Sequence, residues 1–257
     1  MRAFVITAPG QGAVQDVDPP TAQPGEVVVD VRRAGICGTD AELFRGHTGL
    51  TPYPVRIGHE WMGTVSSVGD GVSRRWIGRR VTGDTMLGCG KCRRCRDGRH
   101  HVCEFRAELG IRGARPGALA DQVAVPETAL YELPGQVSDI QGALVEPGGN
   151  ALRAVRAAAL RPGDRLLVEP GKRVVYIGLA ATPSLVNSRE LVLKDVTATG
   201  ILGASAGLSG AIDTYARGEV DPAPLVAAVV RLEHLAPALA GEFPDGAGPG
   251  PKIHVAF

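Results

Sequence analysis

The sequence predicts a mixed α+β fold with a β-rich first part and an α/β second part. From residue 1 to about 135, short apolar runs are separated by turns, and helical patterns are few. From about residue 138, alanine-rich stretches with apolar residues at helical spacing alternate with short apolar runs. The 35 glycines and 19 prolines are spread over many short turns, which is typical of β-rich structure rather than disorder. We therefore expect two domains, residues 1–150 and 151–257.

The first part contains six apolar runs that we interpret as strands. Runs this short and frequent favour a barrel or a sandwich. The predicted strands cover residues 2–7, 26–36, 63–69, 79–84, 117–126 and 129–134. One short helix is expected over residues 38–46, where Thr39 or Asp40 is suited to cap the helix N-terminus.

The second part contains helices and strands in alternation. The pattern predicts a helical stretch over residues 138–160 that is broken at Pro147-Gly148-Gly149. Two further helices are expected over residues 209–219 and 223–241. Strands are expected over residues 173–179, 195–202 and 252–257, and the last of them is a candidate to return to the first domain.

Composition excludes several classes of partner. Charged residues make up 21% of the chain and the formal net charge is +1, which argues against a nucleic-acid partner. No apolar run approaches the roughly 18 residues that a membrane span needs, and the N-terminus lacks the apolar core of a signal peptide. We therefore expect a cytoplasmic protein that acts on a small-molecule substrate, without membrane or nucleic-acid binding.

Four of the five cysteines lie together in "CGKCRRCRDGRHHVC". Cys89, Cys92 and Cys95 are separated by two residues each, and Cys103 follows after seven more. This spacing is typical of a closed four-thiolate zinc site that has a structural role. Two disulfides are an alternative that a cytosolic redox environment disfavours, and an iron–sulfur cluster is a second alternative.

A second set of metal-binding side chains is scattered along the chain. Cys37 lies in "GICGTD", His59 and Glu60 lie in "GHE", and Glu146 lies in "VEPGG". Each signal is weak alone, since a lone cysteine is usually a small buried hydrophobic residue. Together they supply a thiolate, an imidazole and one or two carboxylates. Three protein ligands and a water form a catalytic zinc site with an open position.

The order "ICGTD", "GHE", the cysteine loop, "VEP" and "RPGD" resembles the zinc-dependent medium-chain dehydrogenase/reductase family, and its polyol and threonine dehydrogenase branch in particular. The resemblance is close over residues 1–168 and looser over 173–257. It implies a GroES-like barrel, a truncated Rossmann-type second domain and a catalytic zinc held by Cys37, His59 and Glu146. Glu60 is similar to the family's glutamate beside the metal, which serves as a ligand or as its neighbour.

Two more residues near the second set acquire roles from this resemblance. Thr39 is similar to the hydroxyl that relays a proton from the alcohol. Asp40 is similar to the carboxylate that accepts the other N–H of the histidine ligand and fixes its tautomer. One departure is Gly148-Gly149-Asn150, where the family has a small apolar helix start. We interpret it as a tolerated loop, with a roomier pocket beside Glu146 as the alternative.

The nucleotide-binding part of that family is largely missing. A dinucleotide fold needs βαβ units of about 30 residues and a G-x-G-x-x-G turn. In "RPGDRLLVEPGKRVVYIGL" (161–179), four residues separate the apolar runs 166–168 and 173–179. Parallel strands need a longer crossover, so these runs are expected to form an antiparallel hairpin or one bent strand. "GASAGLSG" (203–210) fits a loop and helix cap better than a nucleotide cradle.

Three functions therefore remain open. The first is a zinc enzyme that uses its metal as a Lewis acid in lyase, cyclase, isomerase or hydrolase chemistry, without NAD(P). The second is an NAD(P)-dependent alcohol or polyol dehydrogenase in a shortened form. The third is a zinc-binding scaffold without catalysis. All three predict two Zn²⁺ per chain, and the resemblance leaves a homodimer through the second-domain sheet as an alternative to a monomer.

Overall fold

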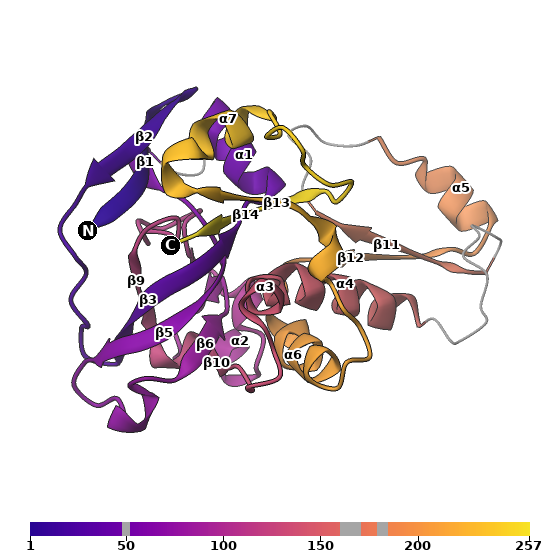
Figure 1. The fold of residues 1–257 in the computed structure, drawn as a ribbon. Coiled ribbons are helices and arrows are strands. Elements are labelled where there is room, and N and C mark those ends of the chain that lie inside the picture. Colours follow the sequence, from indigo (N-terminus) through magenta and orange to yellow (C-terminus); the bar gives the residue numbers. More distant parts are fainter. Residues whose placement is uncertain (48–51, 160–170, 179–184) are drawn as a thin grey trace.

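The computed structural model describes residues 1–47, 52–159, 171–178 and 185–257 (Figure 1). In the first part, ten strands surround two short helices, α1 (Gly38–Arg45) and α2 (Arg93–Arg96). The strands are β1 (Arg2–Ala8), β2 (Gln11–Asp16), β3 (Glu26–Gly35), β4 (Val55–Arg56), β5 (Glu60–Val68), β6 (Arg80–Gly83), β7 (Met86–Leu87), β8 (Ala107–Glu108), β9 (Gln122–Pro126) and β10 (Leu130–Glu132).

The second part begins with two helices and then mixes strands and helices. These elements are α3 (Asp139–Ala143), α4 (Val145–Ala158), β11 (Arg173–Ile177), α5 (Ser188–Leu193), β12 (Thr197–Ile201), α6 (Leu208–Ala216), β13 (Val226–Arg231), α7 (Leu235–Ala240) and β14 (Lys252–Ala256). Short 3₁₀ turns cover Arg74–Trp76, His100–Val102, Glu127–Ala129, Ser205–Gly207, Ala223–Leu225 and Leu232–His234. The mixed α/β architecture agrees with the predicted fold class.

The main sheet joins both ends of the chain. Its strand order is β10-β6-β5-β3-β14-β13, and β9 also pairs with β3. β9 pairs with the first half of β3, and β14 pairs antiparallel with its last residues, Arg33–Gly35. The last strand therefore lies in the sheet of the first part, beside β3 (Figure 1). A three-stranded sheet, β2-β1-β4, and a small β7–β8 pair complete the β-rich part.

Two buried clusters hold these elements together. The larger cluster fills the β-rich part and includes Phe4, Trp61 and Leu119, together with Leu235 and Val255 from the end of the chain. The second cluster lies between β5 and the helices α4 and α6, with Met62, Val145 and Tyr215 among its members. Because residue 150 lies inside α4, no linker separates the two predicted domains there, and the division at 150 stays a prediction.

The helix predicted over residues 223–241 is wrong. Its first half is strand β13, which pairs parallel with β14, and only Leu235–Ala240 form a helix, α7. Val226, Val229 and Val230 are β-branched and satisfy their backbone groups on a neighbouring strand. Alanine has only a weak intrinsic preference for the helix, and the pairing of β13 with β14 overrides it.

The predicted break at Pro147-Gly148-Gly149 is also wrong, because these residues lie within α4. The helical stretch changes direction at Leu144 instead, between α3 and α4. Pro147 is tolerated since it lies in the first turn of α4, where backbone N–H groups have no helical partner. A Cβ on Gly149 would lie 3.1 Å from the Cβ of Ala204, so this glycine allows a close helix crossing rather than a loop.

The end of the chain beyond α4 contains a separate two-stranded sheet. β11 and β12 pair parallel, with α5 between them in the sequence. In Figure 1 this unit lies at the opposite end of the molecule from the β1–β2 hairpin. The predicted hairpin cannot be compared, because its first strand (166–168) lies outside the described residues. No helix within the described ranges is long and apolar enough to cross a membrane.

Candidate metal centres and the adjoining cavity

The four clustered cysteines come together around one point. Their sulfur atoms lie within 4.8 Å of one another, and all four are free thiols. The Sγ atoms are 4.0 Å apart for Cys89 and Cys95 and 3.7 Å apart for Cys92 and Cys103. A tetrahedral zinc with Zn–S bonds of about 2.3 Å requires S–S edges of roughly 3.8 Å. The donor set and its spacing therefore fit zinc.

Local contacts shift the pKa values of two of these cysteines in opposite directions, and burial raises the pKa of Cys95 to about 12. Backbone N–H groups of Lys91 and Cys92 lower the pKa of Cys89 to about 6, which favours a thiolate at neutral pH. The Cys92 sulfur caps α2 by accepting from the N–H of Cys95. The arrangement is closed, with four sulfur donors and no open position, as a structural site requires.

A buried aspartate connects this cysteine loop to the second part of the chain. One Asp84 oxygen lies 2.7 Å from Nε2 of His100, and the other accepts from the Ser205 hydroxyl at 2.9 Å. Asp84 is 3% exposed. Sequence reasoning missed Asp84. A single aspartate at a strand end carries no signal that could have identified it.

The second candidate centre forms where β3 ends and β5 begins. Donor atoms of Cys37, His59 and Glu60 lie within 4.8 Å of one another. His59 is 4% exposed and Glu60 is 1% exposed. Oε2 of Glu60 is buried without a hydrogen-bond partner among the described residues. Buried polar atoms without partners are costly, so this pocket of donors fits a cation.

Asp40 and Thr39 lie beside this group, on the first turn of α1. The helix is capped by Cys37 rather than by the predicted Thr39 or Asp40, because Cys37 keeps an extended backbone before the helix. Asp40 instead accepts from the N–H groups of Cys37 at 2.9 Å and Gly58 at 3.1 Å. Its Oδ1 is 3.5 Å from Nδ1 of His59, and the Thr39 hydroxyl is 3.9 Å from the Cys37 sulfur.

The electrostatics of His59 follow from these neighbours. Burial alone would lower the pKa of His59, but the Asp40 carboxylate and the Cys37 sulfur outweigh burial and raise it well above its usual value. Asp40 therefore orients the histidine electrostatically.

Glu146 lies apart from the three clustered donors. It is 7% exposed, at the start of α4, and its Oε1 accepts from the Asn150 side chain at 2.8 Å. Burial raises the pKa of Glu146 to about 7, and the nearby Glu60 carboxylate adds to the increase. The structure brings Glu146 near the centre but does not group it with Cys37 and His59. Asn150, one residue of the unusual Gly148-Gly149-Asn150 segment, holds its carboxylate.

Lys252, at the start of the last strand, was not predicted. Its Nζ donates to Oε1 of Glu60 at 2.5 Å and to the Ile36 carbonyl at 3.3 Å. The Lys252 side chain is 18% exposed. Sequence reasoning missed this lysine because 192 residues separate it from Glu60, and only the β14–β3 pairing brings the two together.

A cavity of about 500 Å³ adjoins Lys252. One wall is formed by α4, including Pro147 and Leu152, and the other by α6 and residues 220–225. The lining is mostly apolar, with Lys252 and Asp221 as the charged side chains. This size is suited to a small organic molecule.

The β-rich part matches a known family. Residues 23–135 match the alcohol dehydrogenase GroES-like domain. L-threonine 3-dehydrogenase from Sinorhizobium fredii is 34% identical over 200 residues, which are 76% of this chain and 57% of that protein. The enzyme of the same name from Coxiella burnetii is 34% identical over 182 residues, 69% of this chain and 52% of that protein. The chain thus spans slightly more than half the length of these relatives.

Solved structures show the same fold. An alcohol dehydrogenase from E. coli CFT073 in complex with NADH superimposes with a TM-score of 0.88 at 22% identity, covering 100% of this chain and 99% of that one. A 2R,3R-butanediol dehydrogenase from Bacillus subtilis gives 0.84 at 20% identity, with the same coverage. With its GroES-like domain, its threonine dehydrogenase relatives and its cysteine loop, this chain belongs to the zinc-dependent medium-chain dehydrogenase/reductase family, in a form shorter than those relatives.

Proposed function

We propose that this protein is a zinc-dependent oxidoreductase that acts on the hydroxyl group of a small alcohol or polyol. The observation that carries the proposal is the Cys37–His59–Glu60 group together with Lys252, which contacts Glu60 and lines the adjoining cavity. A zinc ion bound there supplies Lewis acidity and lowers the pKa of an alcohol. This reading replaces non-redox chemistry as the main hypothesis, because the characterised relatives are named as dehydrogenases.

Each side chain of this group has a separate role in the proposed site. Cys37 and His59 would hold the ion, with a carboxylate from Glu60 or Glu146 as the third ligand. Asp40 keeps the imidazole oriented, since it lies 3.5 Å from Nδ1. The Thr39 hydroxyl, 3.9 Å from the Cys37 sulfur, is placed to receive the proton of a substrate hydroxyl.

The cysteine loop would hold a second zinc with a structural role. We propose two Zn²⁺ per chain, one in each donor group. The alternative of two disulfides is disfavoured, because all four sulfur atoms face one point instead of forming two separate pairs.

Hydride transfer also requires a nicotinamide beside the substrate. Two of the similar solved structures are described with NADH and with NADP bound, which makes a nicotinamide nucleotide the cofactor to test. The decisive assay incubates zinc-loaded protein with small alcohols, including threonine and 2,3-butanediol, and with NAD⁺ or NADP⁺. Absorbance at 340 nm measures turnover. The Cys37→Ser variant is expected to abolish it, whereas Cys37→Ser that turned over as fast as the parent would refute the proposed centre.

A second candidate is zinc-dependent chemistry without NAD(P), such as hydration or isomerisation. The observation that favours it is the lack of a G-x-G-x-x-G turn after residues 166–168, where the family binds its nucleotide. Isothermal titration with NADH and NADPH separates the two candidates. Micromolar binding favours the dehydrogenase, whereas no binding by zinc-loaded protein favours the second candidate.

We propose a homodimer as the assembly. The unit formed by β11, β12 and α5 exposes apolar side chains, including Ile177 at 46%, Val192 at 79% and Leu193 at 65%. Exposed apolar groups on this sheet edge and on α5 are suited to contact with a second copy. Light scattering after size-exclusion chromatography measures the mass. The cytoplasmic location stays a prediction.

A further inference from the structure

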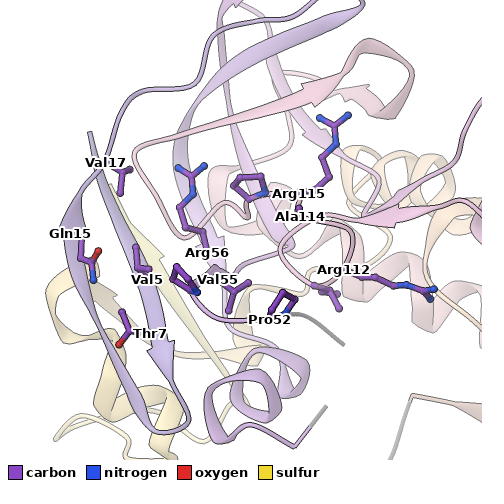
Figure 2. A pocket seen from close by; sticks show the side chains of 13 residues that line it. Val5, Thr7, Gln15, Val17, Pro52, Val55, Arg56, Arg112, Ala114 and Arg115 are labelled. Carbon is purple, nitrogen blue, oxygen red and sulfur yellow. The ribbon is translucent and has the colours of Figure 1, made fainter. Parts of the chain in front are cut away.

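A second cavity lies against the three-stranded sheet β2-β1-β4, on the face of β1 that carries Val5 and Thr7. It measures about 490 Å³ and is bounded by the β1–β2 hairpin, the segment Pro52–Arg56 and the loop that follows β8 (Figure 2). Val5 and Val17 contribute from the hairpin, and Ala114 contributes from the loop. No residue of the Cys37–His59–Glu60 group lines it. This cavity is therefore separate from the proposed active site.

The sheet geometry explains why an apolar cavity forms there. Phe4 and Ile6 of β1 point into the main core, so Val5 points to the other face. On that face Val5 and Ala3 belong to a small apolar cluster that Val17 also contacts. Ala3 is fully buried and Val5 is 6% exposed, so these side chains form the buried apolar floor of the cavity. The loop at Ala114 forms part of its wall.

The charges around the cavity are all positive. Arg56, Arg112 and Arg115 line it, and no aspartate or glutamate does. Arg115 is neutralised by Glu26, with Nη1 and Oε1 2.6 Å apart. The Arg112 side chain extends away from the hairpin in Figure 2. Among the described residues neither Arg56 nor Arg112 forms an ion pair with a carboxylate, and Arg56 is the one that lies opposite Val5.

Arg56 is held in place beside the apolar cluster. In the β1–β4 pairing it lies opposite Val5, so the two side chains share a face. Arg56 is half-buried, and burial lowers its pKa, which reflects the cost of partly removing the guanidinium from water. An anion in the cavity would offset this cost, and a guanidinium binds a carboxylate through two parallel hydrogen bonds.

We propose that this cavity binds a small amphipathic monoanion, a carboxylate with an apolar tail, whose carboxylate pairs with Arg56 and whose tail contacts Val5 and Val17. The Arg56 guanidinium, which lies opposite Val5, is suited to pair with a single carboxylate. The apolar lining matches the tail and disfavours a compact, strongly hydrated anion such as inorganic phosphate.

The test uses octanoate as the probe and zinc-loaded, ¹⁵N-labelled full-length protein. Octanoate is expected to shift the backbone amide signals of Val5, Gln15 and Ala114 in a saturable manner. Octanol, which lacks the charge, and inorganic phosphate, which lacks the tail, are each expected to bind at least about tenfold more weakly, the size typical of a lost charge-assisted contact. Shifts confined to the signals of Cys37 and His59 would overturn the proposal, because they would place octanoate at the metal centre.

Two variants and one control sharpen the test. Arg56→Gln is expected to weaken octanoate binding by at least about tenfold. Thr7→Trp places a large ring in the cavity from an exposed lining position and is expected to abolish binding. Arg93→Gln removes the same charge from a fully exposed side chain outside the cavity and should leave binding unchanged. Parental affinity in both Arg56→Gln and Thr7→Trp would refute the assignment.

Discussion

Replacing Lys252 with methionine tests the contact that connects the last strand to the candidate metal centre. The substitution removes the one ion-pair partner that the Glu60 carboxylate has among the described residues, 2.5 Å away, while Glu60 itself is 1% exposed. Breaking a buried ion pair by removing one partner costs about 3–5 kcal/mol, since the remaining charge has neither water nor a counter-ion. Because Lys252 is 18% exposed, we expect a loss near the lower end, about 3 kcal/mol.

Urea denaturation of Lys252→Met, Glu60→Gln and the double variant, with no metal bound to the Cys37–His59–Glu60 group, measures this coupling. The double variant leaves no unpaired charge, so we expect it to be more stable than Lys252→Met alone. The reasoning fails if Lys252→Met costs less than about 1 kcal/mol, or if the effects of the two substitutions are simply additive. Either result would mean that water or a metal already satisfies Glu60.

Three further predictions concern other parts of the molecule. Metal analysis should find two zinc ions per chain. Cys103→Ser should reduce the zinc content to one ion per chain and lower the thermal midpoint of unfolding. An unchanged zinc content in this variant would exclude the four-cysteine site. Gly149→Ala should destabilise the protein by about 1–2 kcal/mol in urea denaturation, because the cost of overpacking exceeds the gain in helix propensity. Gly135→Ala is the control: a Cβ there meets open space, so the free energy of unfolding should change little. Burial opposes ionisation of Asp121, but the hydrogen bonds from Arg2 outweigh burial and lower the pKa of Asp121. The stability that the ionised Asp121 adds is therefore present above its unfolded-state pKa and is lost as the pH falls through its folded-state pKa. Asp121→Asn should therefore flatten the acid side of the stability–pH profile, and an unchanged profile would contradict this.

Much of the fold could be predicted because local patterns and tertiary structure agree there. The short runs of the first part form strands, and residues 173–177, 197–201 and 252–256 do so in the second. The prediction failed where a local preference met a stronger contact. The alanine-rich run after residue 223 became strand β13 because β14 offered hydrogen bonds along its length.

In the candidate site too, sequence motifs identified some residues, and tertiary contacts decided the rest. The motifs "GICGTD" and "GHE" identified Cys37, His59 and Glu60 as candidate ligands, and the structure groups these three donors together. Glu146 was expected as the third ligand, but it lies outside this group and bonds to Asn150. Which carboxylate completes a metal site depends on side-chain positions that spacing along the chain does not fix.

By itself, the sequence determined the chemistry that is available: four closely spaced thiols, a cysteine–histidine–glutamate set and a β-rich barrel to hold them. The spacing of the cysteines fixes a site within one loop, so no distant contact is needed. Only the tertiary structure decided which distant residues join these sets. Lys252 reaches Glu60, and Ser205 reaches Asp84, because the end of the chain folds back onto the barrel. A long-range contact depends on how strands pair and helices pack over the whole molecule, and no short stretch of sequence carries that information.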